Sequence, residues 1–296
     1  MKRNLYIGVD GGATKTKVRI EDADGCLLTE AQSGPGTIRT NVSKAWYAII
    51  DGIQTALHKI DLDLYDQTHH YHVGLGLAGT EVAESCEEFL SQAHPFASIA
   101  LKSDAYTACL GAHQGKEGGI IIIGTGTIGL KIEKGAVTTV GGWGFPHDDE
   151  GSGAWLGMEA IRLTLESIDH RREPSDFSKA IFRHFKKDLD HMVTWSNQAL
   201  PTHFAELAPI VVEYVKRKNP EAVCLIERAA VSIARIYDSL VKQSTLPKLP
   251  VSLLGGLSHY VESWLPKRIR TRCKPPQGDA TQGAILMIKK SEGFIV

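Results

Sequence analysis

The sequence of 296 residues lacks the features that mark several large classes of protein. Its five cysteines are odd in number and scattered, without a Cys-x-x-Cys pair, which excludes the common zinc and iron–sulfur sites. No apolar run is long enough to cross a membrane, and a net charge of −1 provides no basic surface for nucleic acid. The first residues, Met-Lys-Arg-Asn, lead into an expected strand without an apolar signal core. We therefore expect a cytoplasmic protein with no nucleic-acid or membrane partner.

The best-known nucleotide-binding motifs are also missing or out of place. Residues 111–116 fall one residue short of a P-loop, and Glu117 follows where Ser or Thr is required. Two stretches match G-x-G-x-x-G, but the stretch at 124–129 precedes a strand instead of a helix. The stretch at 74–79 follows a strand and precedes a helix, with Asp104 at the end of the next strand. An NAD-binding dehydrogenase therefore stays open as an alternative.

The chain does contain a glycine-turn hairpin at its start. Residues 6–9 predict a buried strand, a glycine turn breaks it, and residues 15–20 predict the antiparallel return. A turn bare of side chains lets backbone N–H groups approach an anion, and threonine hydroxyls add donors. Asp10 lies where a carboxylate could hold a hydrated Mg²⁺ against that anion, although an ordinary edge hairpin would show the same pattern. The nucleotide-binding residues expected here are Asp10, Gly11, Gly12, Thr14 and Thr16.

The same architecture recurs about one domain later in the chain. Residues 120–123 are four isoleucines that predict a strand, and residues 129–132 predict its return. Two such hairpins, one in each domain, would hold the β- and γ-phosphates of ATP in a shared cleft. The phosphate-binding residues expected in the second turn are Gly124, Thr125, Gly126 and Thr127.

The order of the expected elements divides the chain near Gly115. Residues 1–114 predict a mixed sheet flanked by helices, and residues 115–296 predict a second α/β domain with a mostly helical insertion at about 175–243. The last helix, 279–290, is expected to pack back onto the first domain. The insertion has spare apolar faces, which favours a homodimer.

Several residues outside the hairpins are candidates for acceptor chemistry. The loop 141–153 is rich in glycine and carboxylates; Asp149 and Glu150 could bind vicinal hydroxyls, and Trp143 could pack on a sugar face. Asp104, at the end of a strand, would be the general base, although a helix N-cap would explain this residue in isolation. The pair Gly255–Gly256 would let a nucleotide base lie close to the backbone.

These motifs resemble those of the actin, hexokinase and heat-shock ATPase superfamily. The Asp-Gly-Gly-x-Thr hairpin and Gly124-Thr-Gly-Thr look like its two phosphate motifs. Gly141-Gly-Trp-Gly and Asp149-Glu-Gly-Ser look like the signature of N-acetylglucosamine kinases. The similarity to bacterial glucosamine and N-acetylglucosamine kinases runs the full length, through residues 276–284. One departure is Ala13, where that family usually has a third glycine.

The resemblance implies two ribonuclease-H-like domains flanking a nucleotide and sugar cleft. It also implies an enzyme that uses ATP and Mg²⁺ to phosphorylate the 6-hydroxyl of N-acetylglucosamine, with Asp104 as the catalytic residue, Thr14 and Thr125 as nucleotide contacts and Gly255 in the adenosine motif. The sugar contacts that it implies are Asn41, Gly142, Trp143, Gly144 and Asp149. The alternative acceptor is glucosamine, but the retained Trp-Gly and Asp-Glu pairs favour the acetylated sugar. A non-catalytic sugar sensor is a more distant alternative.

Overall fold

The computed structural model describes residues 2–39 and 41–293 and divides into two compact units. Unit 1 comprises the chain up to Gly118, residues 132–137 and the chain from Pro275 on, and unit 2 comprises residues 119–131 and 138–274. The chain thus leaves unit 1 a few residues after the expected boundary at Gly115 and returns to it near the end. Within the described ranges, no helix is long and apolar enough to cross a membrane.

Unit 1 contains a five-stranded mixed sheet. Its order is β3 (Leu27–Ser33), β2 (Thr16–Glu21), β1 (Arg3–Gly11), β4 (His69–Leu77) and β5 (Ser98–Ser103). β2 is antiparallel to both of its neighbours, β3 and β1, whereas β1, β4 and β5 run parallel. The carboxyl ends of these three parallel strands therefore meet at one edge of the sheet.

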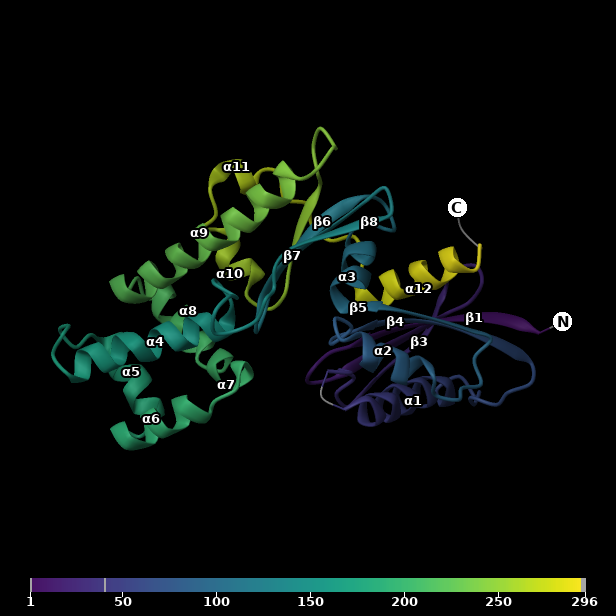
Figure 1. Ribbon diagram of the computed structural model, residues 1–296, viewed down its shortest axis with the longest axis horizontal. Coiled ribbons are helices and arrows are strands. Elements are labelled where there is room, and N and C mark those ends of the chain that lie inside the picture. Colours follow the sequence, from purple (N-terminus) through teal and green to yellow (C-terminus); the bar gives the residue numbers. More distant parts are fainter. Residues whose placement is uncertain (1, 40, 294–296) are drawn as a thin grey trace. The chain divides into compact units, whose positions relative to one another are not determined.

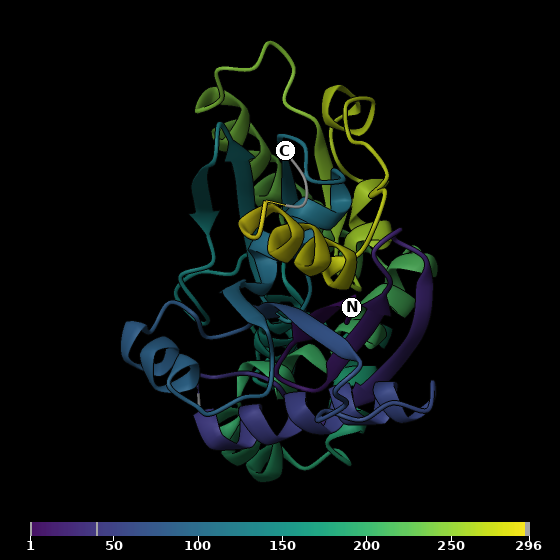
Figure 2. The same ribbon diagram turned by 90° about the vertical axis from the view of Figure 1, so that its right-hand side faces the viewer.

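Helices cover both faces of this sheet, and the alternation in β1 decides which residues face them. Ile7 and Val9 join the core under α1 (Val42–His58), whereas Tyr6 packs against α12 (Ala280–Ser291) on the other face. Figures 1 and 2 show α1 and α12 on opposite sides of the sheet, with α3 (Asp104–Ala112) beside α12. The short helix α2 (Ala83–Leu90) follows β4.

Glycines allow α12 and α3 to approach the sheet closely. A Cβ atom at Gly74 would lie 2.0 Å from the carbonyl oxygen of Ala284, and one at Gly76 would lie 1.9 Å from Oγ1 of Thr107. Two glycines of the 74–79 stretch are thus required for helix–sheet packing, which explains them without a dinucleotide. The helix that should open directly after this motif begins only at Ala83. The dinucleotide-binding hypothesis is therefore wrong.

The second sheet repeats the strand order of the first. Its order is β8 (Ala136–Gly141), β7 (Thr127–Glu133), β6 (Gly118–Ile123) and β9 (Val251–Leu254), with β6 parallel to β9. The order β8-β7-β6-β9 corresponds to β3-β2-β1-β4, which is the architectural repeat expected from the two hairpins. Ile121 and Ile123 of β6 lie in the core of unit 2.

Helices supply most of unit 2. The buried faces of α4 (Gly153–Ile168) and α9 (Pro220–Lys242) contribute to the same core as β6. The helical region expected at 175–243 is present. Before α9 this region contains α5 (Asp176–His184), α6 (Leu189–Gln198), α7 (Pro201–Ala205) and α8 (Ala208–Lys216). Two short helices, α10 (Ser258–Glu262) and α11 (Lys267–Arg270), follow β9.

Candidate active site

Asp10, near the end of β1, is a partly buried carboxylate without a direct hydrogen-bond or ion-pair partner among the described residues. Lys17 lies opposite it in the β1–β2 register. The pKa of Asp10 is raised to about 6, chiefly by burial and then by the charge of Asp104, and against the lowering charges of Lys17 and Lys15. The ionised carboxylate is therefore costly here unless a cation binds beside it.

The turn after Asp10 leaves its tip exposed. The Gly12 N–H donates to the carbonyl oxygen of Lys15 (3.0 Å), which closes the turn over Ala13 and the exposed Thr14. The carbonyl oxygens of Gly11 and Gly12 accept hydrogen bonds from the chain segments at 78 and 36, so the neighbouring loops fasten to this hairpin. Among the described residues, Ala13 is not one of those with positive φ, so alanine carries no backbone strain at this position.

Thr16 was expected to donate to a phosphate, and the structure corrects this prediction. Its side chain is fully buried, and its hydroxyl donates to the carbonyl oxygen of Gly34 at 2.8 Å. Because a hydroxyl has a single O–H donor, one that donates to a buried carbonyl cannot also donate to a ligand at the surface. Thr16 therefore holds the loop after β3 in place, and Thr14 is the exposed threonine of this turn.

Asp104 is the first residue of α3, at the carboxyl end of β5. The N-cap is Ser103, whose Oγ accepts from the Tyr106 N–H at 3.1 Å, so the interpretation of Asp104 as the N-cap is wrong. One oxygen of Asp104 accepts from the Ala105 N–H at 2.8 Å. Burial raises the pKa of Asp104, the Ala105 N–H lowers it, and the charge of Glu81 raises it. This carboxylate retains oxygens that the helix does not require.

Asp10 and Asp104 thus form a pair of partly buried carboxylates at one edge of the sheet of unit 1. Oxygen ligands with unneutralised charge suit Mg²⁺, which keeps several waters and needs only one or two carboxylates. In the described part of the chain, no three His, Cys, Asp or Glu residues gather as a protein-only metal cage, so Asp10 would have to share the ion with phosphates. The donor set fits Mg²⁺ bound in this way.

Two features near this pair were missed from the sequence. Lys17 places an ammonium group on the strand beside Asp10, which the hairpin register could have predicted. An ion pair between Arg39 and Glu81 links the loop before α1 to the loop after β4. The charge of Arg39 lowers the pKa of Asp104. No motif signals this ion pair, because its two residues are distant in sequence.

The turn of the second hairpin is tied to the start of α4. The Gly153 N–H donates to the carbonyl oxygen of Gly124 (2.8 Å), and the Ala154 N–H donates to that of Thr125 (3.1 Å). Thr125 is exposed, as a phosphate contact should be. Thr127 is only 2% exposed and its hydroxyl is buried, so its predicted role as a surface donor is not supported by the geometry.

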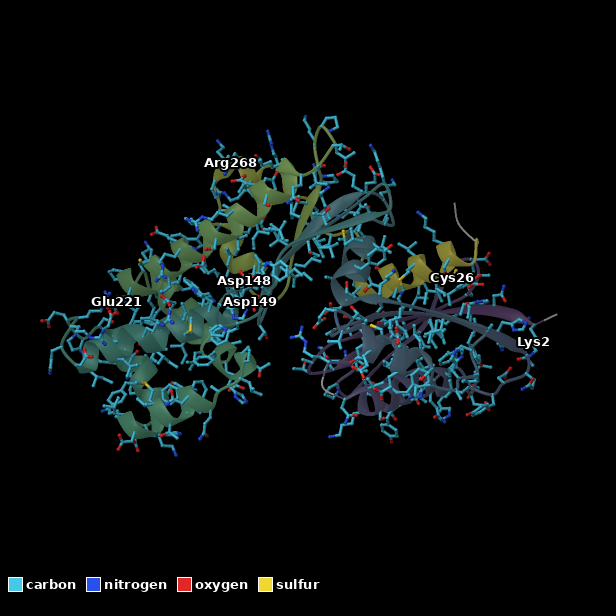
Figure 3. The ribbon with its side chains drawn as sticks, in the orientation of Figure 1. Lys2, Cys26, Asp148, Asp149, Glu221 and Arg268 are labelled. Atoms are coloured by element: carbon cyan, nitrogen blue, oxygen red, sulfur yellow. The ribbon has the colours of Figure 1, made fainter. Side chains whose placement is uncertain are left out.

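Asp149 connects the glycine-rich loop to this turn. Its Oδ1 accepts from the Thr127 N–H at 2.9 Å, and a Cβ atom at Gly126 would lie 2.9 Å from both carboxylate oxygens. Asp148 accepts from the N–H of Trp143 at 2.8 Å, while the Trp143 side chain stays 79% exposed. Figure 3 labels Asp148 and Asp149 where the loop enters α4. Two adjacent carboxylates therefore shape the proposed sugar loop.

The other predicted site residues also have local structural roles. Gly142 and Gly144 have positive φ values of 77° and 99°, which favour glycine. Gly255 has φ of 92° and lies against the carbonyl oxygen of Ile123, whereas a Cβ at Gly256 would meet open space. The remaining two predicted contacts are also held locally: Glu150 accepts from Ser232 Oγ (2.7 Å), and Asn41 caps α1 by accepting from the Lys44 N–H (2.7 Å).

Comparison with known proteins agrees with this architecture. The chain is 36% identical over 289 residues to the glucosamine kinase GspK of Vibrio cholerae, covering 98% of this chain and 97% of that protein. It is 26% identical over 280 residues to the N-acetyl-D-glucosamine kinase of Dictyostelium discoideum, covering 86% of each. A solved structure from Chromobacterium violaceum, provisionally named an N-acetylglucosamine kinase, matches with a TM-score of 0.90 and 38% identity over 97% of this chain and 99% of that one.

The two sheets with their covering helices form the actin-like ATPase fold that this structural similarity predicts. A family model matches residues 7–287, which span both units and include both hairpins. The chain belongs to the BadF/BadG/BcrA/BcrD ATPase family.

Proposed function

We propose that this protein is an amino-sugar kinase that transfers the γ-phosphoryl group of ATP to the 6-hydroxyl of N-acetylglucosamine. The observation that carries the proposal is Asp104, a partly buried carboxylate at the end of β5 that the helix does not need as its cap. Its raised pKa brings its proton affinity closer to that of a sugar hydroxyl, which favours proton transfer in the transition state. Asp104 would accept the proton of the attacking hydroxyl.

Phosphoryl transfer requires positioning and charge neutralisation more than covalent chemistry. The exposed turn at residues 12–15 of unit 1 and the exposed Thr125 of unit 2 would donate hydrogen bonds to phosphate oxygens. Mg²⁺, when bound, would neutralise phosphate charge beside Asp10, whose carboxylate is otherwise unpaired. Gly256, where a Cβ would meet open space, would leave room for the adenosine after β9, while Gly255 makes the turn against the Ile123 carbonyl.

The glycine-rich loop of unit 2 would bind the acceptor sugar. The exposed indole of Trp143 offers a face for the pyranose ring, and Asn41 keeps its amide N–H₂ available because its oxygen caps α1. Asp149, whose Oδ1 accepts from the Thr127 N–H, would hold the loop against the second phosphate turn and contact the sugar there. Support for the acetylated sugar comes from the loop motif and from two of the named relatives, whereas the glucosamine kinase of Vibrio cholerae supports the free amine.

An assay of ADP release with Mg²⁺ and ATP over a panel of hexoses tests the proposal. We expect turnover on N-acetylglucosamine, with kcat/KM at least about tenfold above that on glucosamine, and formation of the 6-phosphate. A reversed ratio would make glucosamine the acceptor. Binding of amino sugars without ADP release would favour a sensor. Absence of both binding and turnover would refute the kinase proposal. Light scattering and cell fractionation would test our expectation of a cytoplasmic homodimer.

A further inference from the structure

A groove in unit 1 extends beyond the residues needed for phosphoryl transfer. It encloses about 590 Å³ between α1 and the loop after β3, with an apolar lining that includes Pro35 and Tyr47. This volume is within the range of about 300–1,000 Å³ typical of small-molecule sites. The Tyr47 side chain is 74% exposed at this groove. A large aromatic ring is thus presented to a ligand instead of being packed into the core.

The groove reaches the first phosphate turn and one proposed acceptor contact. Ala13 of the first phosphate turn lines it, and so does Asn41, a proposed sugar contact. Because the Asn41 oxygen is held by the Lys44 N–H, its amide N–H₂ is left as a donor. A ligand seated on Asn41 could therefore extend along α1 without leaving unit 1.

The chemistry of the groove suits a carbohydrate ring better than an acyl chain. Pro35, Ala48 and Tyr47 provide apolar surface, while Ser43, Lys44 and Asp51 add a hydroxyl, an ammonium and a carboxylate. In the described part of the chain, none of these three side chains forms a hydrogen bond or ion pair with another residue. A pyranose has an apolar face for the aromatic ring and hydroxyls at its edge for polar partners.

We propose that this groove is an extension subsite that binds a second pyranose attached to the acceptor, so that the enzyme also takes a disaccharide of N-acetylglucosamine. The inference rests on the proposed function, because one ring of the disaccharide would occupy the acceptor position at Asn41. The second ring would stack on Tyr47. The 6-hydroxyl of the first ring would remain the group that is phosphorylated.

Variants at Tyr47 test the subsite with a matched control. Tyr47→Ala removes the ring, Tyr47→Phe keeps it, and Tyr65→Ala removes a tyrosine that is equally exposed, at 74%, but lies outside the groove. Calorimetric Kd values for the monosaccharide and for N,N′-diacetylchitobiose should be measured with all variants, together with kcat/KM for each sugar. A panel of differently linked disaccharides identifies the linkage that fits.

We expect the best-fitting disaccharide to bind about tenfold more tightly than the monosaccharide in the wild type. Tyr47→Ala should abolish this advantage and leave monosaccharide turnover within about twofold, whereas Tyr47→Phe and Tyr65→Ala should retain the advantage. Disaccharides that bind no better than the monosaccharide, or equal losses in Tyr47→Ala and Tyr65→Ala, would overturn the subsite. If Tyr47-dependent binding persists while no amino sugar is turned over, the kinase proposal fails and the subsite stands.

Discussion

Replacing Asp10 with Asn should stabilise the free protein while abolishing its activity. The pKa of Asp10 is raised from 3.8 to about 6, chiefly by burial, so ionising this carboxylate destabilises the native state relative to the unfolded state. A raised pKa contributes stability at low pH that is lost as the pH rises through about 6. Asparagine has nearly the same shape and cannot ionise, so its advantage should grow with pH.

The size of the effect follows from linkage. A shift of about two pKa units, at 1.36 kcal/mol per unit, gives Asp10→Asn a gain of about 3 kcal/mol at pH 8, and about half of that at pH 5. Asp104 contributes to the shift, so the gain should diminish in an Asp104→Asn background. The same variant should lose the stabilisation that Mg²⁺ and ATP give the wild type, because the cation would lose its carboxylate.

Urea denaturation of the free protein at pH 5 and pH 8 measures this gain. Asp24→Asn is the control, since Asp24 is an exposed carboxylate in the turn between β2 and β3. Equal gains at both pH values, or no gain at pH 8, would refute the assignment of Asp10 as a partly buried, uncompensated carboxylate. Retention of the stabilisation by Mg²⁺ and ATP would refute its role beside the metal.

Three further substitutions test the site and the packing around it. Asp104→Asn should lower kcat by about 10²–10⁴-fold with little change in stability, and kinetics alongside denaturation would expose an indirect effect through unfolding. Asp149→Ala leaves the Thr127 N–H without its acceptor and should lower the free energy of unfolding by about 1–3 kcal/mol. Because Asp149 is bonded to the second phosphate turn, KM should rise for both sugar and ATP, and a rise for sugar alone would contradict a link between the loop and that turn. Gly74→Ala places a Cβ against the carbonyl of Ala284, and should cost about 1–3 kcal/mol in urea denaturation; wild-type stability would contradict the close packing.

The local pattern of the sequence determined the elements and the turns that matter. Short apolar runs broken by small residues predicted both hairpins, because such runs and glycine turns are encoded within a dozen residues. The repeat of that pattern predicted the repeated strand order. Asp104 could be selected because a carboxylate directly after a predicted strand lies at the edge of the sheet.

Only the tertiary structure decided what several of these side chains do. Thr14 and Thr16 look alike in the sequence, but the loop after β3 buries Thr16 and accepts the hydrogen bond of its hydroxyl. Asp149 looked like a pure ligand until folding brought it against the N–H of Thr127. The pKa of Asp10 likewise depends on burial and on Asp104, which is distant in sequence. Hydrogen-bond partners and desolvation come from contacts between remote segments, and no local pattern encodes them.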